Sequence, residues 1–172
     1  MRASRFWLAF GVATALLALT LVARSLNLSA PRAGDERADL SHTFPDMHGR
    51  DLRLADYAGK PLVINLWATW CAPCRLEMPQ LVDLAARYQD RGLTILGISV
   101  DDTPEDIRAF AKEFGVNYPL LVGLGKEDAL ASLGYFGGVP MSIFIRADGV
   151  VVHRLTGIAT TEAWERRIET LF

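Results

Sequence analysis

The stretch that decides the fold is residues 65–79, which read Asn-Leu-Trp-Ala-Thr-Trp-Cys-Ala-Pro-Cys-Arg-Leu-Glu-Met-Pro. It joins an apolar run, residues 61–68, to a segment with helical periodicity, residues 72–89. A short apolar run of this kind is typical of a strand that is buried on both faces of a sheet. The two cysteines, Cys71 and Cys74, therefore stand where a buried strand is expected to end and a helix to begin.

The spacing of these cysteines indicates chemistry rather than a structural crosslink. They are the only two in the chain, arranged as Cys71-Ala72-Pro73-Cys74. A disulfide stabilises a fold most when it closes a long loop, and this pair would close almost none. A cysteine at a helix N-terminus faces unpaired N–H groups and the positive end of the helix dipole, which lower the thiol pKa to roughly 3.5–7.5. We expect Cys71 to be an exposed nucleophile that attacks disulfides, and Cys74, more buried, to resolve the mixed disulfide.

Strand and helix patterns alternate along the rest of the chain. The expected strands cover residues 61–68, 93–100, 141–146 and 150–156, and the last two form a hairpin around Asp148-Gly149. The expected helices cover residues 72–89, 104–114, 127–133 and 161–171. This alternation predicts an α/β sandwich with a central mixed β-sheet and helices on both faces. A β-hairpin over residues 43–54 should extend the sheet at its edge, and residues 103–134 should form a central insertion.

The N-terminal residues differ in composition from the rest. Residues 6–23 carry no charge, and at about 1.5 Å per residue they form a helix of about 27 Å, close to the hydrocarbon thickness of a bilayer. We expect residues 1–23 to be a transmembrane anchor; the alternative is a cleaved signal peptide, whose apolar core is normally roughly 7–15 residues long. Residues 24–41 are polar and are predicted to be a flexible linker. Residues 42–172 would then form the catalytic domain.

Charge and histidine content exclude two classes of function. The 18 basic and 20 acidic residues give a net charge of −2 and are well mixed, so no basic stripe is present to bind nucleic acid. The histidines, His42, His48 and His153, are scattered without the spacing of metal ligands, and we expect no metal site. Asp101 and Asp102 follow a predicted strand and are expected to cap the turn before the next helix.

The segment 65–79 resembles the thioredoxin superfamily, and within it the TlpA/ResA branch of membrane-tethered extracytoplasmic thiol reductases. Further matches follow in the same order along the chain. Pro79 matches the helix proline of these proteins, Gly138-Val139-Pro140 matches their cis-proline loop, and residues 144–149 match the hairpin after it. The resemblance covers about residues 42–172 and implies a thioredoxin-like fold for them.

The resemblance also implies roles for individual residues. Pro140 is expected to be cis, which would leave the N–H and C=O of Val139 free to pair with an extended substrate segment. Glu77 matches the acidic residue that follows the second cysteine by three positions, so its carboxyl could take the proton of that thiol. The alternative for Glu77 is a solvated surface residue paired with Arg75 or Arg87.

Four other positions refine this interpretation. Thioredoxin itself carries a buried aspartate where this chain has Asn65, which cannot exchange protons, so Glu77 is the natural substitute. Met141 follows the predicted cis-proline, where related proteins more often place threonine or glutamate, and this departure leaves the natural substrate open. Trp67 is expected in the core. Trp70, beside the first cysteine, is expected to shield the nucleophile or to contact substrate.

The dipeptide between the cysteines suggests the direction of the reaction. Ala72-Pro73 lacks the histidine of oxidising relatives, so we expect a fairly negative potential and reduction of disulfides in extracytoplasmic proteins. The redox-active disulfide would serve without another cofactor. The resemblance implies apocytochrome c or a copper-site assembly protein as substrate, and an integral membrane thiol carrier as electron donor. The alternatives are an oxidant or isomerase of the same fold, a Cu(I) metallochaperone that binds the metal through both thiolates, and a non-catalytic binding module.

Location follows from the redox chemistry. Protein disulfides persist outside the cytoplasm, so we expect an enzyme on the cytoplasmic membrane whose catalytic domain faces the periplasm or the extracytoplasmic side. Arg2 and Arg5 favour an amino terminus in the cytoplasm, whereas Arg24, Arg32 and Arg37 on the other flank weaken that orientation signal.

Overall fold

The structure, a computed structural model, describes residues 36–172. The predicted membrane anchor, residues 1–23, lies outside the described residues, as does most of the predicted linker. Among residues 36–172, no helix is both long and apolar enough to cross a bilayer.

A five-stranded mixed sheet forms the centre of the domain, in the order β5-β4-β3-β6-β7. Its strands are β3 (Leu62–Trp67), β4 (Thr94–Ser99), β5 (Leu120–Val122), β6 (Met141–Ile145) and β7 (Val151–Thr156). β3, β4 and β5 run parallel, whereas β6 is antiparallel to β3 and β7 is antiparallel to β6. Every residue of the central strand β3 is buried, as its apolar sequence predicts for a strand that is covered on both faces.

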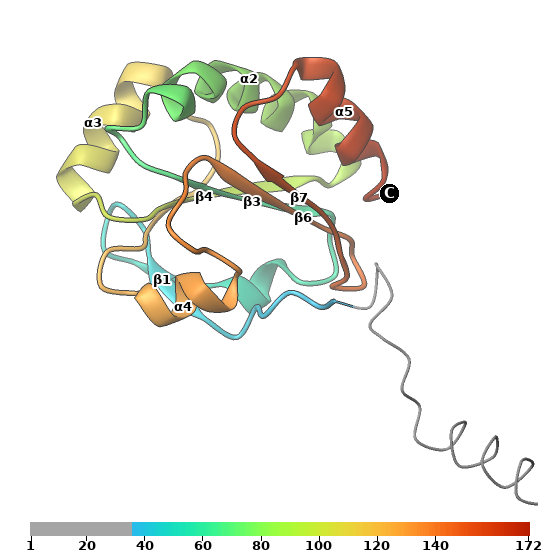
Figure 1. Cartoon of the computed structure of the whole chain (residues 1–172), viewed down its shortest axis with the longest axis horizontal. Coiled ribbons are helices and arrows are strands. Elements are labelled where there is room, and N and C mark those ends of the chain that lie inside the picture. Colours follow the sequence, from blue (N-terminus) through green and yellow to red (C-terminus); the bar gives the residue numbers. More distant parts are fainter. Residues whose placement is uncertain (1–35) are drawn as a thin grey trace, which may run out of the picture. The chain divides into compact units, whose positions relative to one another are not determined.

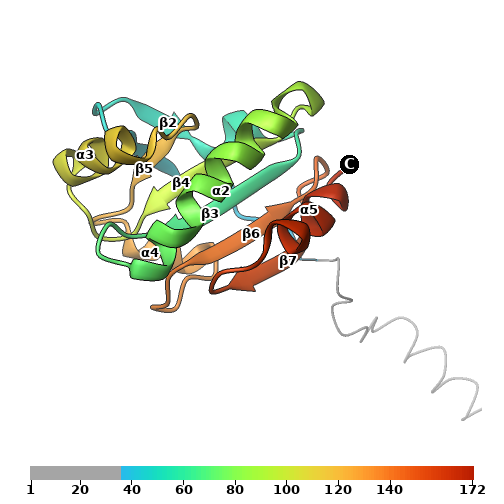
Figure 2. The ribbon, with the colours of Figure 1, turned by 90° about the horizontal axis from the view of Figure 1, so that it is seen from above.

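Helices cover both faces of this sheet (Figure 1). One face carries α2 (Ala72–Tyr88), α3 (Pro104–Phe114) and α5 (Thr161–Glu169). The other face carries α4 (Glu127–Ser132) and the hairpin of β1 (Thr43–Pro45) and β2 (Asp51–Arg53). Seen from above, α2 runs along β3 while α5 lies over β6 and β7 (Figure 2). This is the predicted thioredoxin-like sandwich, and the insertion at residues 103–134 consists of α3, β5 and α4.

Two parts of the fold differ from the sequence prediction. Strand β5 was not predicted, because its three residues, Leu-Leu-Val, are too few to show a period. The N-terminal hairpin was predicted to extend the central sheet, but β1 and β2 form a separate two-stranded sheet. A single bridge from Asp46 to Leu121 connects this hairpin to β5.

The chain already contacts the domain within the stretch that was predicted to be a linker. Ala38 donates its N–H to the carbonyl of Gly149 at 3.0 Å, and Val151 donates to the carbonyl of Glu36 at 2.8 Å. The Glu36 carboxylate also pairs with Arg154 on β7. The domain therefore includes residues from at least position 36, whereas the sequence placed its boundary at 42. The polar composition of residues 36–41 reflects their position at the surface of the edge strand.

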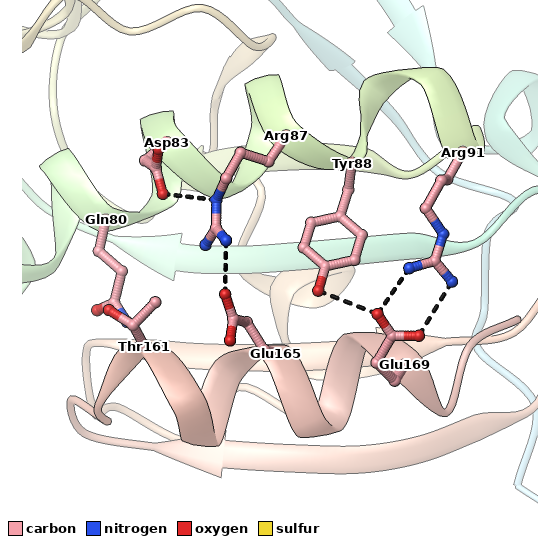
Figure 3. Close-up of polar contacts among 8 residues, drawn as sticks. All are labelled: Gln80, Asp83, Arg87, Tyr88, Arg91, Thr161, Glu165 and Glu169. Carbon is pink, nitrogen blue, oxygen red and sulfur yellow. Dashed lines mark hydrogen bonds and ion pairs between the residues drawn. The ribbon is translucent and has the colours of Figure 1, made fainter.

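The outer half of α2 and the 3-10 turn that follows it, Gln89–Arg91, are joined to α5 by polar and charged side chains, which we call the α2–α5 seam (Figure 3). Arg87 contacts Asp83 at 2.8 Å and Glu165 at 2.6 Å. The next turn repeats the arrangement, because Arg91 contacts Glu169 at 2.6 Å and Tyr88 donates its hydroxyl to the same carboxylate at 3.1 Å. Each carboxylate of this seam therefore faces an arginine.

Candidate active site

Three segments meet at one edge of the sheet and bring the predicted site residues together. The carboxyl end of β3 leads directly into the cysteine pair and α2. Because β6 is antiparallel to β3, with Met141 opposite Leu66, the start of β6 lies beside the end of β3. Pro140, which immediately precedes β6, is therefore placed next to the cysteine loop, although the two lie far apart in the sequence. The strand register thus brings the cysteine pair and the proline loop to the same edge of the sheet.

Cys71 and Cys74 form a disulfide with a Cα–Cα distance of 5.3 Å. Cys71 is the N-cap of α2, and its Sγ accepts the N–H of Cys74 at 3.2 Å. An N–H directed at this sulfur favours negative charge on it once the disulfide opens. Pro73 occupies the first turn of the helix, where its missing N–H leaves no hydrogen bond unmade.

The exposure of Cys71 differs from the prediction. Cys71 was expected to be an exposed nucleophile, but only 3 % of its surface is accessible, against 0 % for Cys74. Cys71 is more accessible than Cys74, as the sequence predicts, but it is not the exposed residue that was expected. The reason is local: the sulfur is bonded to Cys74 and hydrogen-bonded to its N–H, which holds it against the first turn of the helix.

Glu77 lies one turn after Cys74 and is buried, with 3 % of its surface accessible. The alternative of a surface glutamate paired with Arg75 or Arg87 is therefore wrong. Arg75 pairs with Glu113 and lies over the ring of Phe114 at 4.9 Å, and Arg87 belongs to the α2–α5 seam.

The environment of the Glu77 carboxyl favours its protonated form. Burial raises the pKa of Glu77 to about 7, and a hydrogen bond from Asn65 opposes this rise. A carboxyl with a pKa near neutrality can both accept and release a proton under physiological conditions. The structure thus places such a group one helical turn from the sulfur of Cys74.

A polar cluster holds this carboxyl from the sheet side. The Asn65 amide nitrogen donates to Glu77 Oε1 at 3.0 Å and to Ser142 Oγ at 3.0 Å. Sequence reasoning singled out Asn65 but missed Ser142. The available signal was a polar residue within the apolar run Met-Ser-Ile-Phe-Ile, two positions after the cis-proline.

A buried tyrosine also belongs to the surroundings of Glu77. The Tyr118 hydroxyl donates to Met78 Sδ at 2.8 Å. Burial raises the pKa of Tyr118, and the charge of Glu77 raises it further. Tyr118 is therefore neutral at physiological pH and adds no charge to the site. The sequence offered no signal for it, since it lies in the short segment before the unpredicted strand β5.

The loop before the cysteines is held by two aspartates. Trp70 is 65 % exposed, and its indole Nε1 donates to Asp101 Oδ1 at 3.0 Å. Asp102 is buried and accepts the backbone N–H of Thr69 at 2.7 Å. These aspartates were predicted to cap the turn before α3, but the N-cap of that helix is Thr103. Their carboxylates instead anchor the residues that precede Cys71, and this contact across strands left no local signal in the sequence.

The predicted cis-proline loop has the expected geometry. The Val139–Pro140 peptide bond is cis, and the Pro140 carbonyl accepts the N–H of Gly157 at 2.8 Å. Among residues 36–172, Val139 makes no backbone hydrogen bond. Its N–H and C=O are thus free to pair with another chain, although the side chain itself is partly buried.

Met141 faces away from the cysteines. Because neighbouring strand residues point to opposite faces, Ser142 faces Asn65 and α2 while Met141 faces the α4 side. There it lines a hollow of about 570 Å³ together with Phe136, Gly138 and Arg154. The departure from the family at position 141 therefore changes a surface beside the proline loop and leaves the surroundings of Glu77 unchanged.

Large apolar side chains are exposed at the edge of the sheet that carries the cysteine pair. Five of them expose about half of their surface or more: Trp70 (65 %), Leu76 (74 %), Leu124 (49 %), Phe136 (91 %) and Ile158 (52 %). All five lie in loops at the same edge of the sheet or in the first turns of α2. We call these residues the apolar rim. Exposed apolar patches of this kind are typical of surfaces that bind other proteins.

The two cysteines are the redox-competent groups of this site. Within residues 36–172, no group of three or more histidine, cysteine, aspartate and glutamate side chains is arranged to hold a metal ion.

Comparison with known proteins gives consistent matches. The model of the AhpC/TSA family matches residues 33–154. The protein named thiol-disulfide oxidoreductase ResA from Geobacillus thermodenitrificans is 33 % identical over 126 residues, which span 73 % of this chain and 71 % of the relative. Its namesake from Bacillus anthracis is 32 % identical over 120 residues, spanning 70 % of this chain and 68 % of the relative.

Solved structures agree with the fold. A secreted disulfide oxidoreductase of Mycobacterium tuberculosis superposes with a TM-score of 0.70 at 24 % identity, covering 77 % of this chain and 97 % of that one. A DsbF homologue from Corynebacterium diphtheriae superposes with a TM-score of 0.69 at 28 % identity, covering 79 % of this chain and 88 % of that one. Both superpositions cover a similar share of this chain.

Proposed function

The chain belongs to the AhpC/TSA family and is a thiol–disulfide oxidoreductase, and we propose that it reduces protein disulfides through Cys71 and Cys74, with Glu77 as proton acceptor. The observation that carries this proposal is the buried Glu77 carboxyl. It lies one helical turn from Cys74, and its pKa of about 7 suits proton exchange at neutral pH.

The first step opens the substrate disulfide. The Cys71 thiolate attacks one sulfur of the substrate, and the other substrate sulfur leaves as a thiolate that takes a proton from water. The product is a mixed disulfide between Cys71 and the substrate. The N–H of Cys74, which points at Cys71 Sγ, stabilises the thiolate before the attack.

The second step releases the substrate. The Cys74 thiol gives its proton to Glu77 and attacks Cys71 Sγ, so that the Cys71–Cys74 bond forms while the bond to the substrate breaks. The second substrate sulfur leaves with the electron pair and is protonated. Two electrons have then passed from the dithiol to the substrate, and the domain is left with a Cys71–Cys74 disulfide.

The surface around the cysteines suits a protein substrate. Val139 offers an unpaired N–H and C=O to an extended segment, in the manner of strand addition. Trp70 and Phe136, both prominent in the apolar rim, would cover apolar side chains of that segment. Asp101 keeps the Trp70 ring in place through its bond to Nε1. Ala72 and Pro73 form the short loop against which the substrate sulfur would lie.

The direction of the reaction is proposed from the uncharged dipeptide between the cysteines. Ala72 and Pro73 between the cysteines carry no charge, and the closest arginine along the helix, Arg75, is engaged by Glu113. Without a cation to stabilise the thiolate, the reduced form is a strong electron donor. A redox titration in glutathione buffers should give a potential well below that of strong oxidants; a value near −120 mV would instead assign an oxidase role.

The cellular setting and the partners are part of the same proposal. The uncharged run over residues 6–23 supports an anchor in the cytoplasmic membrane, with the catalytic domain on the extracytoplasmic side, where disulfides persist. An integral membrane thiol carrier would return the electrons to the domain. Apocytochrome c and copper-site assembly proteins are the proposed substrates.

Substrate trapping tests the proposal directly. In Cys74→Ala, the mixed disulfide cannot be resolved, so the substrate should remain bonded to Cys71 and be identified by mass spectrometry after reduction. Cys71→Ala is the matched control and should trap nothing. Equal capture by the two variants would contradict the assignment of Cys71 as nucleophile.

A further inference from the structure

The amide of Asn65 has an unusual position for a side chain that cannot exchange protons. It is fully buried in the central strand β3 and directly contacts the carboxyl that we propose to be the proton acceptor. Both hydrogens of its NH2 group have acceptors, Glu77 Oε1 and Ser142 Oγ, each at 3.0 Å. The amide is therefore fixed at two points that belong to different elements.

The strand register provides the second point. Asn65 on β3 lies opposite Ser142 on β6, so the two side chains are neighbours on the same face of the sheet. Ser142 is itself buried, with 2 % of its surface accessible. The hydroxyl thus holds the amide in one orientation, and the amide in turn holds one oxygen of the carboxyl.

The two oxygens of Glu77 are not equivalent. Oε1 accepts the Asn65 amide, whereas Oε2 is buried and has no hydrogen-bond partner among the described residues. A buried oxygen without a partner is costly, and protonation of the carboxyl relieves part of that cost. Oε2 is therefore the oxygen on which a proton from Cys74 is best received.

We propose that Asn65 and Ser142 are positioning residues, which hold Glu77 Oε1 and thereby leave Oε2 to exchange the proton with Cys74. This inference rests on the proposed function of Glu77. In this inference, Asn65 on β3 and Ser142 on β6 set the orientation and the pKa of the Glu77 carboxyl, although neither residue acts on the sulfurs.

The other groups around Glu77 do not replace this control. Tyr118, which approaches from the segment before β5, is neutral and donates its hydroxyl to Met78. The arginines on the same helix as Glu77, Arg75 and Arg87, are engaged by carboxylates at the surface. Among residues 36–172, Asn65 is the side chain that donates a hydrogen bond to the Glu77 carboxyl.

The test is a direct measurement of the Glu77 pKa in the oxidised full-length protein. The side-chain carboxyl carbon of glutamate, labelled with ¹³C, is followed by NMR through a pH titration, and Glu77→Gln identifies its signal. In Asn65→Leu, the hydrogen bond that stabilises the charged form is lost, so the pKa should rise by about one pH unit. The same midpoint in Asn65→Leu and in the wild type would overturn the inference.

The second variant tests the other contact and protects against a failure of the first to fold. Ser142→Ala frees the amide from its anchor, so the pKa of Glu77 should rise by a smaller amount, a few tenths of a unit. Ser142→Thr keeps the hydroxyl and should restore the wild-type midpoint. A midpoint that does not move in Ser142→Ala would remove Ser142 from the proposal.

A control separates this effect from a general loss of packing. Ser99→Ala removes another buried hydroxyl, on β4, which donates to Asp102 and does not contact Glu77. We expect the pKa of Glu77 in this variant to equal that of the wild type. A shift equal to that of Ser142→Ala would show that any lost hydroxyl in the sheet has the same effect, and would overturn the inference.

The readout is independent of turnover, so two failures can be told apart. If Glu77→Gln resolves the mixed disulfide as fast as the wild type, the proton-accepting role fails, and with it the functional part of this inference. If Glu77→Gln is slow but the Glu77 pKa does not depend on Asn65, the proposed function stands and only the positioning role is overturned.

Discussion

Helix α2 carries two kinds of carboxylate, and their difference shows what burial does to the same chemical group. In its first turns, Glu77 is buried and makes no ion pair with any residue between 36 and 172, and burial raises its pKa to about 7. In its outer half, Asp83 lies at the surface and pairs with Arg87, as the carboxylates of α5 pair with arginines (Figure 3). On α5, the pKa of Glu169 is lowered by its hydrogen bond with Arg91. The Glu169 carboxylate is thus kept charged by its arginine, whereas the buried Glu77 carboxyl is kept ready to exchange a proton.

The largest effect should come from the cysteines, which carry out the thiol–disulfide exchange at the start of α2. In Cys74→Ala, release of substrate from the mixed disulfide should stop, because no second sulfur is present to attack Cys71. Stopped-flow measurement with a disulfide peptide would show formation of the mixed disulfide without the second phase. A normal second phase in this variant would contradict the proposed resolving role.

The next effect should come from removing the buried carboxyl itself. Glu77→Gln should slow the resolving step at pH 7 by roughly 10²-fold or more, a typical contribution of a positioned proton acceptor. In the wild type the rate should fall as the pH falls through about 7, since Glu77 becomes protonated there and can no longer accept a proton.

A seam carboxylate provides the matched control for this comparison. Glu165→Gln removes a partly exposed carboxyl that pairs with Arg87 and lies outside the active site, so the rate of resolution should equal that of the wild type at every pH. If Glu77→Gln and Glu165→Gln resolved the mixed disulfide at the same rates from pH 5 to 9, the proposed proton-accepting role of the buried carboxyl would be contradicted.

The buried carboxyl should also affect the free energy of unfolding, and its contribution should depend on pH in the direction opposite to that of the seam carboxylate Glu169. The folded-state pKa of Glu77, about 7, is above its ordinary value of 4.5, so the folded protein binds this proton more tightly than the unfolded chain. The resulting stabilisation is complete below pH 4.5, decreases as the pH rises and is lost above 7, and it amounts to about 3 kcal/mol. Urea unfolding of wild type and Glu77→Gln should show this loss in the wild type alone.

Glu169 should give the reverse dependence on pH. Its pKa is lowered in the folded state, so its contribution to stability is present above its ordinary pKa of 4.5 and is lost as the pH falls below that value.

A Glu77→Gln variant that lost stability between pH 4.5 and 7 as steeply as the wild type would show that a group other than Glu77 causes the pH dependence in that range.

The smallest effect should come from the exposed seam. Arg91→Ala removes the pair with Glu169 and the contact with the Phe172 ring, whose centroid lies 4.0 Å from the guanidinium carbon. Exposed ion pairs contribute little, and salt screens them, so the loss of stability should be slight and should shrink in high salt. Denaturant unfolding at low and high ionic strength would test this, and a large loss that is independent of salt would contradict it.

Local patterns in the sequence were sufficient for most of the fold. The apolar run of β3 and the Asp-Gly turn before β7 each depend on neighbouring residues, and each was predicted. Strand β5 was missed because three residues cannot show a period. The β1–β2 hairpin was placed on the wrong sheet, since nothing within a hairpin specifies which edge it will join.

The site shows the same division. The cysteine pair and Pro140 were found because each carries a local motif. The anchoring of Trp70 by Asp101 was missed, and the aspartates were given a capping role, because their partners come from another strand. The limited exposure of Cys71 was also missed, since accessibility depends on how the first turn of α2 packs.

By itself, the sequence determined which groups are chemically available: two cysteines at a helix start, a carboxyl one turn later and a proline loop that follows. Those features depend on neighbours in the chain, whose spacing is fixed by covalent geometry. Only the tertiary structure decided the state of Glu77, because its burial and its bond to Asn65 depend on β3, β6 and α2 packing together. The pKa of a carboxyl is set by the solvent and dipoles around it, and these come from residues distant in the sequence.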